Sequence, residues 1–477
     1  MGESLAKADE DVVVAAFTRV ARNFSAAAWL PDSHSVADDP WGVARQSLPF
    51  GPALDSDFAE YAAASVPLHL GDAWTYFGQA MHAVSSGAVD VAQHLLYYCE
   101  LRAMNALLFR HGMVLMAESN FVLTGSGIEK VPFPDGAGRL ERNSHQSIWV
   151  LFTEWASSAR GSRFCGELIQ FAGQPLQAWA AERPTPVELT GAMGALLKDW
   201  GVDIARFSSD RAVRNNSSYT PTRLHPKPSE VSPAFVADLL EQVWHLVAPV
   251  DEVAFQQLDP FIARIAFDTF ARGEQGDATG NDEDASDEAP MAPIDPDEMD
   301  IVGPYVPRDQ TITAFWVERV LGRSAGRFVP EFIDDHVKHP TPSVLIDASP
   351  DLTGESPARI FNGMVGRALI LLRFATGATR DLISAAGCST DDVDFWIKDM
   401  LLMHGIRVPE TNDYRDLWFD IEDAVAGLDE VRSETDQENL ARLNEESAKE
   451  MQILVGFERV PAWAAAPVPD EEPEQVA

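Results

Sequence analysis

Apolar residues recur at three- and four-residue spacing, the period of an α-helix, along most of the chain. The stretch 91–112, VAQHLLYYCELRAMNALLFRHG, shows this pattern strongly and is apolar around most of its circumference. A helix of that composition belongs inside a bundle, because each of its faces needs an apolar neighbour. The same pattern predicts further helices at 10–30, 73–86, 145–160, 164–181, 187–216, 233–247, 311–321, 357–376, 391–404 and 414–454. The predicted fold class is therefore all-α.

Capping residues predict where several of these helices begin. Gly71-Asp72 is a candidate start for the helix that precedes residue 87, and Asp90 is the candidate start of the next. Ser232 followed by Pro233 is typical of an N-cap with proline in the first turn. The loops between these helices are short, which predicts antiparallel neighbours.

Two segments depart from the helical pattern. Residues 113–143 contain the run TGSGIEKVPFPDGAG and predict a long loop that covers a site. Residues 343–347 predict one short strand. A weak internal similarity also links 102–112 (RAMNALLFRHG) with 367–377 (RALILLRFATG), and either duplication or two unrelated amphipathic helices would produce it.

Composition divides the chain into domains. No Lys or Arg occurs between Arg272 and Arg308, where acidic residues, Gly and Pro accumulate, and such a segment cannot bury apolar surface. The predicted organisation is an N-terminal helix and wrapping arm (1–66), a helical bundle (67–250), an acidic disordered linker (273–304), a C-terminal helical domain (305–460) and a disordered tail (461–477).

The net charge of the chain argues against some classes of binding partner. The 477 residues include 36 Lys+Arg and 74 Asp+Glu, a net charge of −38, which repels a polyanion at long range and argues against general DNA coating. Three isolated cysteines form no CxxC pattern, so a disulfide framework is not expected. No apolar run reaches the ~18 residues of a membrane span. The expected location is the cytoplasm, without a membrane partner.

Arg102 is the most informative single residue. At 100° per residue it falls on the apolar side of the 91–112 helix, between Tyr98 and Ala106. Two interpretations stay open. Its aliphatic stem packs in the core while the guanidinium pairs with a carboxylate, or the guanidinium faces an anionic ligand in a cleft.

Arg214 raises the same question in the 187–216 helix. The residues from Asn215 to Tyr219 supply donors and acceptors where that helix ends. An Arg-Asn pair suits phosphate or ribose recognition, although simple capping of the helix end needs no ligand. We expect Arg102 and Arg214 to face each other across a groove that forms an anion site. The ligand-binding residues expected there are Arg102, Asp210, Arg211, Arg214 and Asn215.

The segments YYCELRAMNALLFRHG (97–112) and DRAVRNNSSY (210–219) together resemble the HEPN superfamily, helical-bundle domains of prokaryotic defence, toxin and RNA-processing systems. In that family a later helix ends in Arg, a polar residue and, a few positions on, His. Arg214 and Asn215 match, but Tyr219 stands where the histidine is expected. The resemblance covers residues 67–250 and implies a HEPN-like helical bundle there.

The resemblance implies an RNA-related role. Because the motif histidine is missing, we expect a binding or adaptor component of an antiviral defence or RNA-related conflict system that is not catalytic by itself. Two alternatives stay open: a metal-independent ribonuclease that uses Arg214, Asn215 and Tyr219, and a structural subunit of a larger complex. The expected partners are another protein or a second copy of the chain, with RNA or a nucleotide in a local cleft, and no cofactor.

Metal chemistry has one candidate segment. In EFIDDHVKH, the residues Glu331, Asp335 and His339 share a helical face, which permits a metal site. Such clusters are more often solvated helix faces, so no metal is predicted. The motifs GxxxxGK[ST], HExxH and GxSxG are missing from the sequence, which leaves NTPase, zincin and hydrolase functions without support.

Overall fold

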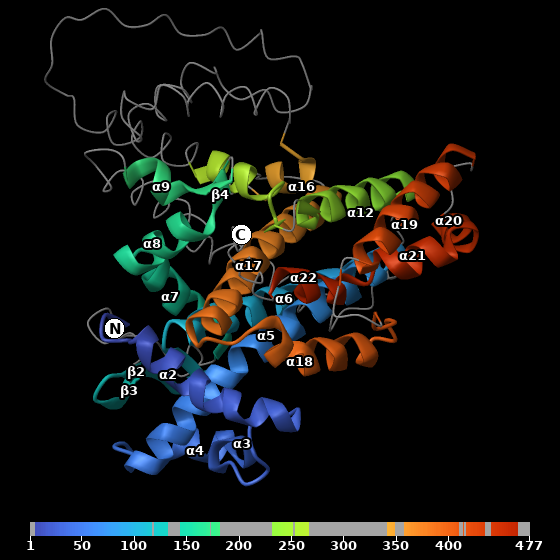
Figure 1. Ribbon diagram of the computed structural model, residues 1–477. Helices are drawn as coiled ribbons and strands as arrows, with labels where there is room; N and C mark the ends of the chain where they lie inside the picture. Colours follow the sequence, from blue (N-terminus) through green and yellow to red (C-terminus); the bar gives the residue numbers. More distant parts are fainter. Residues whose placement is uncertain are drawn as a thin grey trace, which may run out of the picture.

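The computed structural model describes residues 5–116, 119–131, 144–171, 173–181, 231–250, 253–266, 341–348, 357–409, 414, 416–434 and 440–465. Most of these residues are helical, which confirms the predicted fold class in its coarse form, and small antiparallel sheets are added to the helices (Figure 1). None of the described helices combines the length and the apolar composition that a bilayer crossing requires.

The longer helices are α2 (Glu10–Val20), α5 (Pro52–Ser85), α6 (Val89–Arg110), α7 (Ser144–Ala156), α8 (Ala159–Leu168), α12 (Pro233–Val247), α17 (Pro357–Ala385), α18 (Thr390–Met403) and α19 (Asp416–Glu434). The shorter helical segments are η1 (Ala21–Ala26), α3 (Ser35–Asp38), α4 (Pro40–Arg45), α9 (Leu176–Ala181), α16 (Ser343–Ile346), α20 (Leu440–Glu446), α21 (Ala448–Leu454), η4 (Phe457–Arg459) and α22 (Val460–Ala464).

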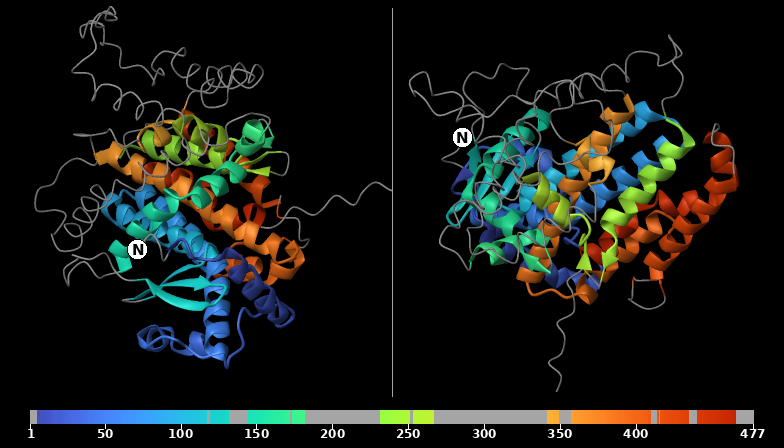
Figure 2. Two further views of the ribbon diagram at one scale, coloured as in Figure 1. Left: turned by 90° about the vertical axis from the view of Figure 1, so that its left-hand side faces the viewer. Right: turned by 90° about the horizontal axis from the view of Figure 1, so that it is seen from above.

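Three central helices, α5, α6 and α17, pack against one another (Figures 1 and 2). Their contacts are dominated by fully buried apolar side chains, as the sequence pattern of 91–112 predicts for α6. Trp74 of α5 donates a buried hydrogen bond of 3.2 Å from its indole nitrogen to the hydroxyl of Thr376 of α17. This bond joins residues that are far apart in the sequence, so α17 is an integral part of the N-terminal bundle.

Helix α5 is longer than predicted. It runs without interruption through Pro67 and through Gly71-Asp72, so the predicted helix start at Gly71-Asp72 is wrong. A proline inside a helix removes one backbone hydrogen bond and costs ~3 kcal/mol. The extensive burial of α5 against α2, α6 and α17 offsets that cost. Asp72 does not cap a helix; its carboxylate lies 3.4 Å from the guanidinium of Arg102 on α6.

Residues 113–116 and 119–131 form a sheet where a loop was predicted. The strands β1 (Met113–Met116), β2 (Ser119–Thr124) and β3 (Gly127–Val131) pair antiparallel in the order β1-β2-β3. All 6 residues of β2 are buried, so its sequence lacks the alternation of polar and apolar residues that identifies a half-exposed strand. Two further pairs are β4 (Gln170–Phe171) with β5 (Gln174–Pro175), and β6 (Pro249–Val250) with β7 (Val253–Ala254).

The predicted strand at 343–347 is a short helix, α16, which packs on α17. The close approach depends on Gly366, since a Cβ there would lie 2.2 Å from the carbonyl oxygen of Val344. Residues 343–346 are therefore helical where they pack against α17.

The described parts of the two predicted domains share one hydrophobic core. Trp244 of α12 stacks on Phe457 of η4, with ring centroids 4.1 Å apart, and donates a 2.7 Å hydrogen bond to the carbonyl of Leu454. In place of two separate domains, the segments before and after the acidic segment pack together. The predicted tail also begins too early, because α22 extends to Ala464 and is largely buried. The predicted linker (273–304) lies outside the described residues.

Candidate functional site: an arginine-lined pocket

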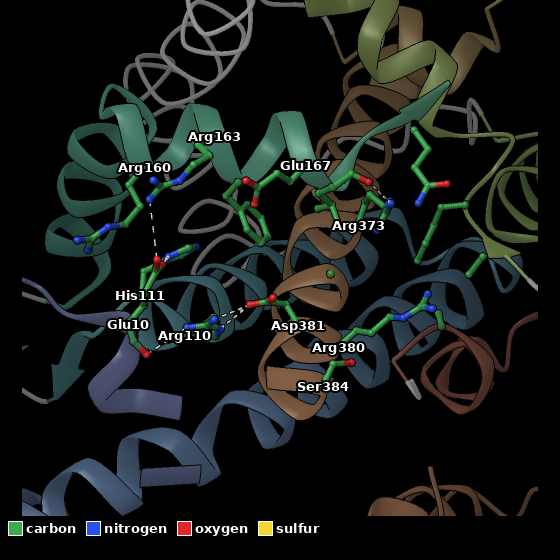
Figure 3. Close-up of a pocket in the computed structure, with 17 residues that line it drawn as sticks. Glu10, Arg110, His111, Arg160, Arg163, Glu167, Arg373, Arg380, Asp381 and Ser384 are labelled. Atoms are coloured by element: carbon green, nitrogen blue, oxygen red, sulfur yellow. Dashed lines mark hydrogen bonds and ion pairs between the residues drawn. The ribbon is translucent and has the colours of Figure 1, made fainter. Parts of the chain in front are cut away.

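A cavity of about 420 Å³ lies between α8, α17 and the adjoining ends of α2 and α6, and we call it the arginine pocket (Figure 3). Five arginines and three carboxylates line it. The arginines are Arg110, Arg160, Arg163, Arg373 and Arg380, and the carboxylates are Glu10, Glu167 and Asp381. In a chain with a net charge of −38, this local excess of positive charge stands out.

Two helices supply most of the pocket. Figure 3 shows Arg160 and Arg163 extending from α8, and Arg373 and Arg380 from α17. Within each helix the spacing of three or seven residues places the two arginines on one face. The helices approach closely at Gly377, where a Cβ would lie 2.2 Å from a methyl carbon of Leu168. Glycine is therefore required on α17 at the point where α8 crosses it.

Arg373 is held by a buried ion pair. Its guanidinium donates hydrogen bonds of 2.7 and 2.8 Å to the two carboxylate oxygens of Asp259, and another of 2.8 Å to the carbonyl of Leu168. Only 8% of the Arg373 side chain and 2% of the Asp259 side chain are exposed. Burial raises the pKa of Asp259, and the charge of Arg373 opposes that shift. Arg373 thus joins α17 to the end of α8, and three of its five N–H donors are used in these bonds.

Arg110 is also paired, at the end of α6. Its Nε and Nη2 donate hydrogen bonds of 2.9 and 2.5 Å to one carboxylate oxygen of Asp381 on α17. The arginine is buried, whereas the aspartate is half exposed. The pair connects α6 to α17 below the cavity, as Figure 3 shows.

Glu10 and His111 form a hydrogen-bonded pair at one end of the pocket. The Nδ1 atom of His111 lies 3.0 Å from a carboxylate oxygen of Glu10. This hydrogen bond lowers the pKa of Glu10 to about 2, while burial lowers the pKa of His111. Near neutral pH the imidazole is therefore neutral, with its proton on Nδ1 because a carboxylate can only accept. Its Nε2 carries the lone pair, is buried, and has no hydrogen-bond partner among the described residues.

Arg160 and Arg380 differ from the paired arginines. In the part of the chain that the structure describes, neither of them makes a hydrogen bond or an ion pair. Arg163 is mostly exposed and lies 3.9 Å from Glu10. Burial lowers the pKa of Arg380, and the neighbouring charge of Arg373 lowers it further. The pocket therefore holds guanidinium charge that no described carboxylate neutralises, and an anion is the chemical group that would do so.

Arg102, the residue singled out in the sequence, lies outside this pocket. Its Nη1 lies 3.0 Å from Nδ1 of His69 and 3.4 Å from the carboxylate of Asp72. Burial lowers the pKa of His69 to about 3, so the imidazole is neutral and accepts from the guanidinium. These contacts favour the first interpretation of Arg102, in which the guanidinium is satisfied within the chain. The other predicted site residues lie outside the described residues: Asp210, Arg211, Arg214, Asn215, Tyr219, Glu331, Asp335 and His339.

The sequence prediction missed the residues that form the pocket. Arg110 and His111 stand near the end of the apolar stretch 91–112, and both arginines of α8 stand in the run ARGSR. Arginines at helical spacing are typical of solvated faces, so they gave no signal in isolation. The weak similarity between 102–112 and 367–377 does fall on α6 and α17, which pack together beside the pocket.

One group of possible metal ligands occurs among the described residues, formed by His34, Asp57 and Glu60. Nδ1 of His34 accepts the backbone N–H of Ala37, as an N-cap does. A neutral imidazole that accepts at Nδ1 keeps its proton on Nε2, which removes the lone pair that a metal needs. His34 therefore caps α3, while Glu60 pairs with Arg19 and Asp57 accepts a hydrogen bond from Ser35.

Comparison with known proteins does not identify a family for this chain. No family model, characterised protein or solved structure matches this chain. The resemblance of 67–250 to HEPN proteins stays a prediction. The function proposed below is therefore argued from the chemistry of the arginine pocket.

Proposed function

We propose that the arginine pocket binds a phosphate-bearing small molecule of nucleotide size. The observation that carries the proposal is that Arg160 and Arg380 both line this cavity and make no hydrogen bond or ion pair among the described residues. A guanidinium matches phosphate oxygens through parallel hydrogen bonds. The cavity of about 420 Å³ falls within the range of small-molecule sites, about 300–1,000 Å³.

His111 supports a ligand that also carries a hydroxyl group. Its Nε2 lone pair is an acceptor without a partner, and the Nδ1 bond to Glu10 keeps the ring in that tautomer. A sugar hydroxyl near the phosphate can donate to this nitrogen once a shift of the ring or of its neighbours exposes it, because the atom is buried. The ring of Phe164, which packs edge-on against His111 with centroids 5.1 Å apart, adds an apolar wall. A ribose phosphate combines the two groups that this pocket accepts.

The biological setting that we propose follows the sequence resemblance. A HEPN-like chain that binds a nucleotide or a terminal phosphate of RNA would act as a binding or adaptor component of an RNA-related or defence system. Incubation with a mixed RNA pool tests the ribonuclease alternative, because cleavage that depends on Arg214 would replace the binding role with a catalytic one.

The binding proposal is tested by calorimetric titration of the full chain with ADP and with inorganic pyrophosphate, in the presence of EDTA. Arg380→Gln should weaken both ligands about tenfold or more, because a hydrogen bond to a charged group contributes about 1.5–3 kcal/mol. Arg45→Gln is the matched control, since it removes the same charge from an exposed position away from the pocket. Equal effects of the two substitutions, or no binding to the unsubstituted chain, would refute the proposal.

Folding of the variant is checked in the same samples. Arg380 has no described partner and is partly buried beside Arg373, so its replacement should leave the unfolding midpoint unchanged or slightly raised. A loss of binding that accompanies a large loss of stability would point to a structural role for Arg380.

A further inference from the structure

A second hollow, of about 670 Å³, lies between α12 and α19, and we call it the α12–α19 groove. It shares no lining residue with the arginine pocket, and Figures 1 and 2 show α12 and α19 side by side at a distance from α8. Its apolar lining consists of Trp244, Pro342, Trp418, Ile421 and Val425. Trp418 and Val425 are only half-buried, so apolar surface at the floor is open to a partner.

Carboxylates form the rim of this groove. Asp238 and Glu241 stand on α12, and Glu422 and Asp429 stand on α19. Asp238 pairs with Arg432 at 2.6 Å, whereas Glu241 and Asp429 have no ion-pair partner among the described residues. Burial raises the pKa of Glu241, and the charge of Asp429 raises it further. The rim therefore carries negative charge in excess of what its described neighbours balance.

The dimensions of the groove suit a helix. Its lining positions on α19 run from Trp418 to Asp429 at spacings of three and four residues, so they form one face of three helical turns. At 1.5 Å per residue this face is about 16 Å long. A partner helix of about three turns, laid along α12 and α19, would cover the apolar floor between the two acidic rims.

We propose that the α12–α19 groove binds a helical segment of a partner protein that presents apolar residues on one face and Lys or Arg on both flanks. Apolar side chains would pack on Trp418 and Val425, and basic side chains would meet Glu241 and Asp429. A second copy of this chain is a poorer occupant, because its net charge is −38. Phosphate-bearing ligands are repelled by the same rim that attracts a basic helix.

The probe is a fluorescein-labelled, 14-residue synthetic peptide with Leu along one helical face and Lys on the others, and its counterpart has Glu in place of Lys. Fluorescence anisotropy measures binding of both to the full chain. We expect the Lys peptide to bind and the Glu peptide not to bind. Hydrogen exchange should show new protection in α12 and α19 when the Lys peptide is present.

General attraction to an acidic protein is separated from groove binding by two charge-reversed variants. Glu241→Lys changes an exposed residue at the rim, and Asp423→Lys changes an exposed residue of α19 that does not line the groove. Both variants have the same net charge. Glu241→Lys should weaken the Lys peptide about fivefold or more relative to Asp423→Lys, because the loss of a rim contact adds to local repulsion.

Three outcomes would overturn the proposal. They are equal weakening by the two variants, protection by the Lys peptide outside α12 and α19, and equal binding of the Glu peptide. The groove could also be protected already in the free chain, with no further increase when the Lys peptide is added. That result would show that another part of the same chain occupies the groove, and it too would refute a partner helix. None of these results depends on whether the arginine pocket binds phosphate.

Discussion

Replacement of Arg373 by methionine should strongly destabilise the protein. The substitution keeps the length of the aliphatic stem but removes three hydrogen bonds, two of them to Asp259, whose side chain is 2% exposed. Loss of one partner of a buried ion pair leaves an uncompensated charge and costs about 3–5 kcal/mol. The backbone N–H of Gln170 still donates to Asp259 at 3.0 Å, so the lower half of this range is expected.

The pH dependence of the stability lost in Arg373→Met tests whether the unpaired Asp259 causes that loss. Without Arg373, only the hydrogen bond from Gln170 opposes the effect of burial on Asp259, and the pKa of this carboxyl rises further above the unfolded value. A carboxyl whose pKa is higher in the folded state than in the unfolded state contributes to the stability of the fold when the pH is below its unfolded pKa. This contribution is lost as the pH rises through the folded pKa. The free-energy difference between Arg373→Met and the parent should therefore be smaller at pH 5 than at pH 7.

Urea unfolding followed by tryptophan fluorescence at both pH values measures the effect. The double variant Arg373→Met with Asp259→Asn should recover most of the stability, because it removes the unpaired charge and keeps an acceptor for Gln170. Arg45→Met is the control at an exposed arginine and should change stability by less than about 0.5 kcal/mol. A loss below about 1 kcal/mol for Arg373→Met, or no recovery in the double variant, would contradict the buried pair.

Two further substitutions test separate parts of the structure. Burial raises the pKa of Glu458 to about 7, so this carboxyl opposes folding increasingly as the pH rises from its unfolded pKa through 7. Glu458→Gln should therefore stabilise the protein by about 3 kcal/mol at pH 8 and not at pH 4, as measured by urea unfolding. Gly377→Ala, which would stabilise an exposed helix by about 1 kcal/mol, should here cost about 1–3 kcal/mol because the new Cβ meets Leu168, and Leu168→Ala in the same chain should reduce the added cost. Stabilisation by Gly377→Ala in the thermal midpoint would show that α8 and α17 do not approach as closely as the structure has them.

The parts of the fold that follow from local pattern were predictable, and the parts that follow from tertiary packing were not. The Ser232-Pro233 cap starts α12 as predicted, because both residues act on the adjacent backbone. Gly71-Asp72 failed as a cap because the neighbours of α5 stabilise the helix through that point. Strand β2 was missed because it is buried on both faces, and a fully buried strand of 6 residues has no periodic signature.

The site was less predictable than the fold for the same reason. Its residues come from α2, α6, α8 and α17, and the hydrogen bond between Arg110 and Asp381 spans 271 positions. Sequence spacing relates residues within one helix and carries no information about such a pair. The sequence marks Arg102 as a charge on an apolar helix that needs a partner, but it could not show that His69 and Asp72 of the preceding helix contact its guanidinium.

The distribution of charge limits what the arginine pocket can bind. At physiological ionic strength, charges further away than about 8 Å are largely screened, so the charged residues that line the cavity set the field that a phosphate meets inside it. A long polyanion also places phosphates outside the cavity, against a surface whose net charge is −38. Each outer phosphate then adds repulsion instead of the release of counterions that normally drives nucleic-acid binding. The ligand that gains most from this pocket is therefore short, with one or a few phosphates that fit wholly among the arginines.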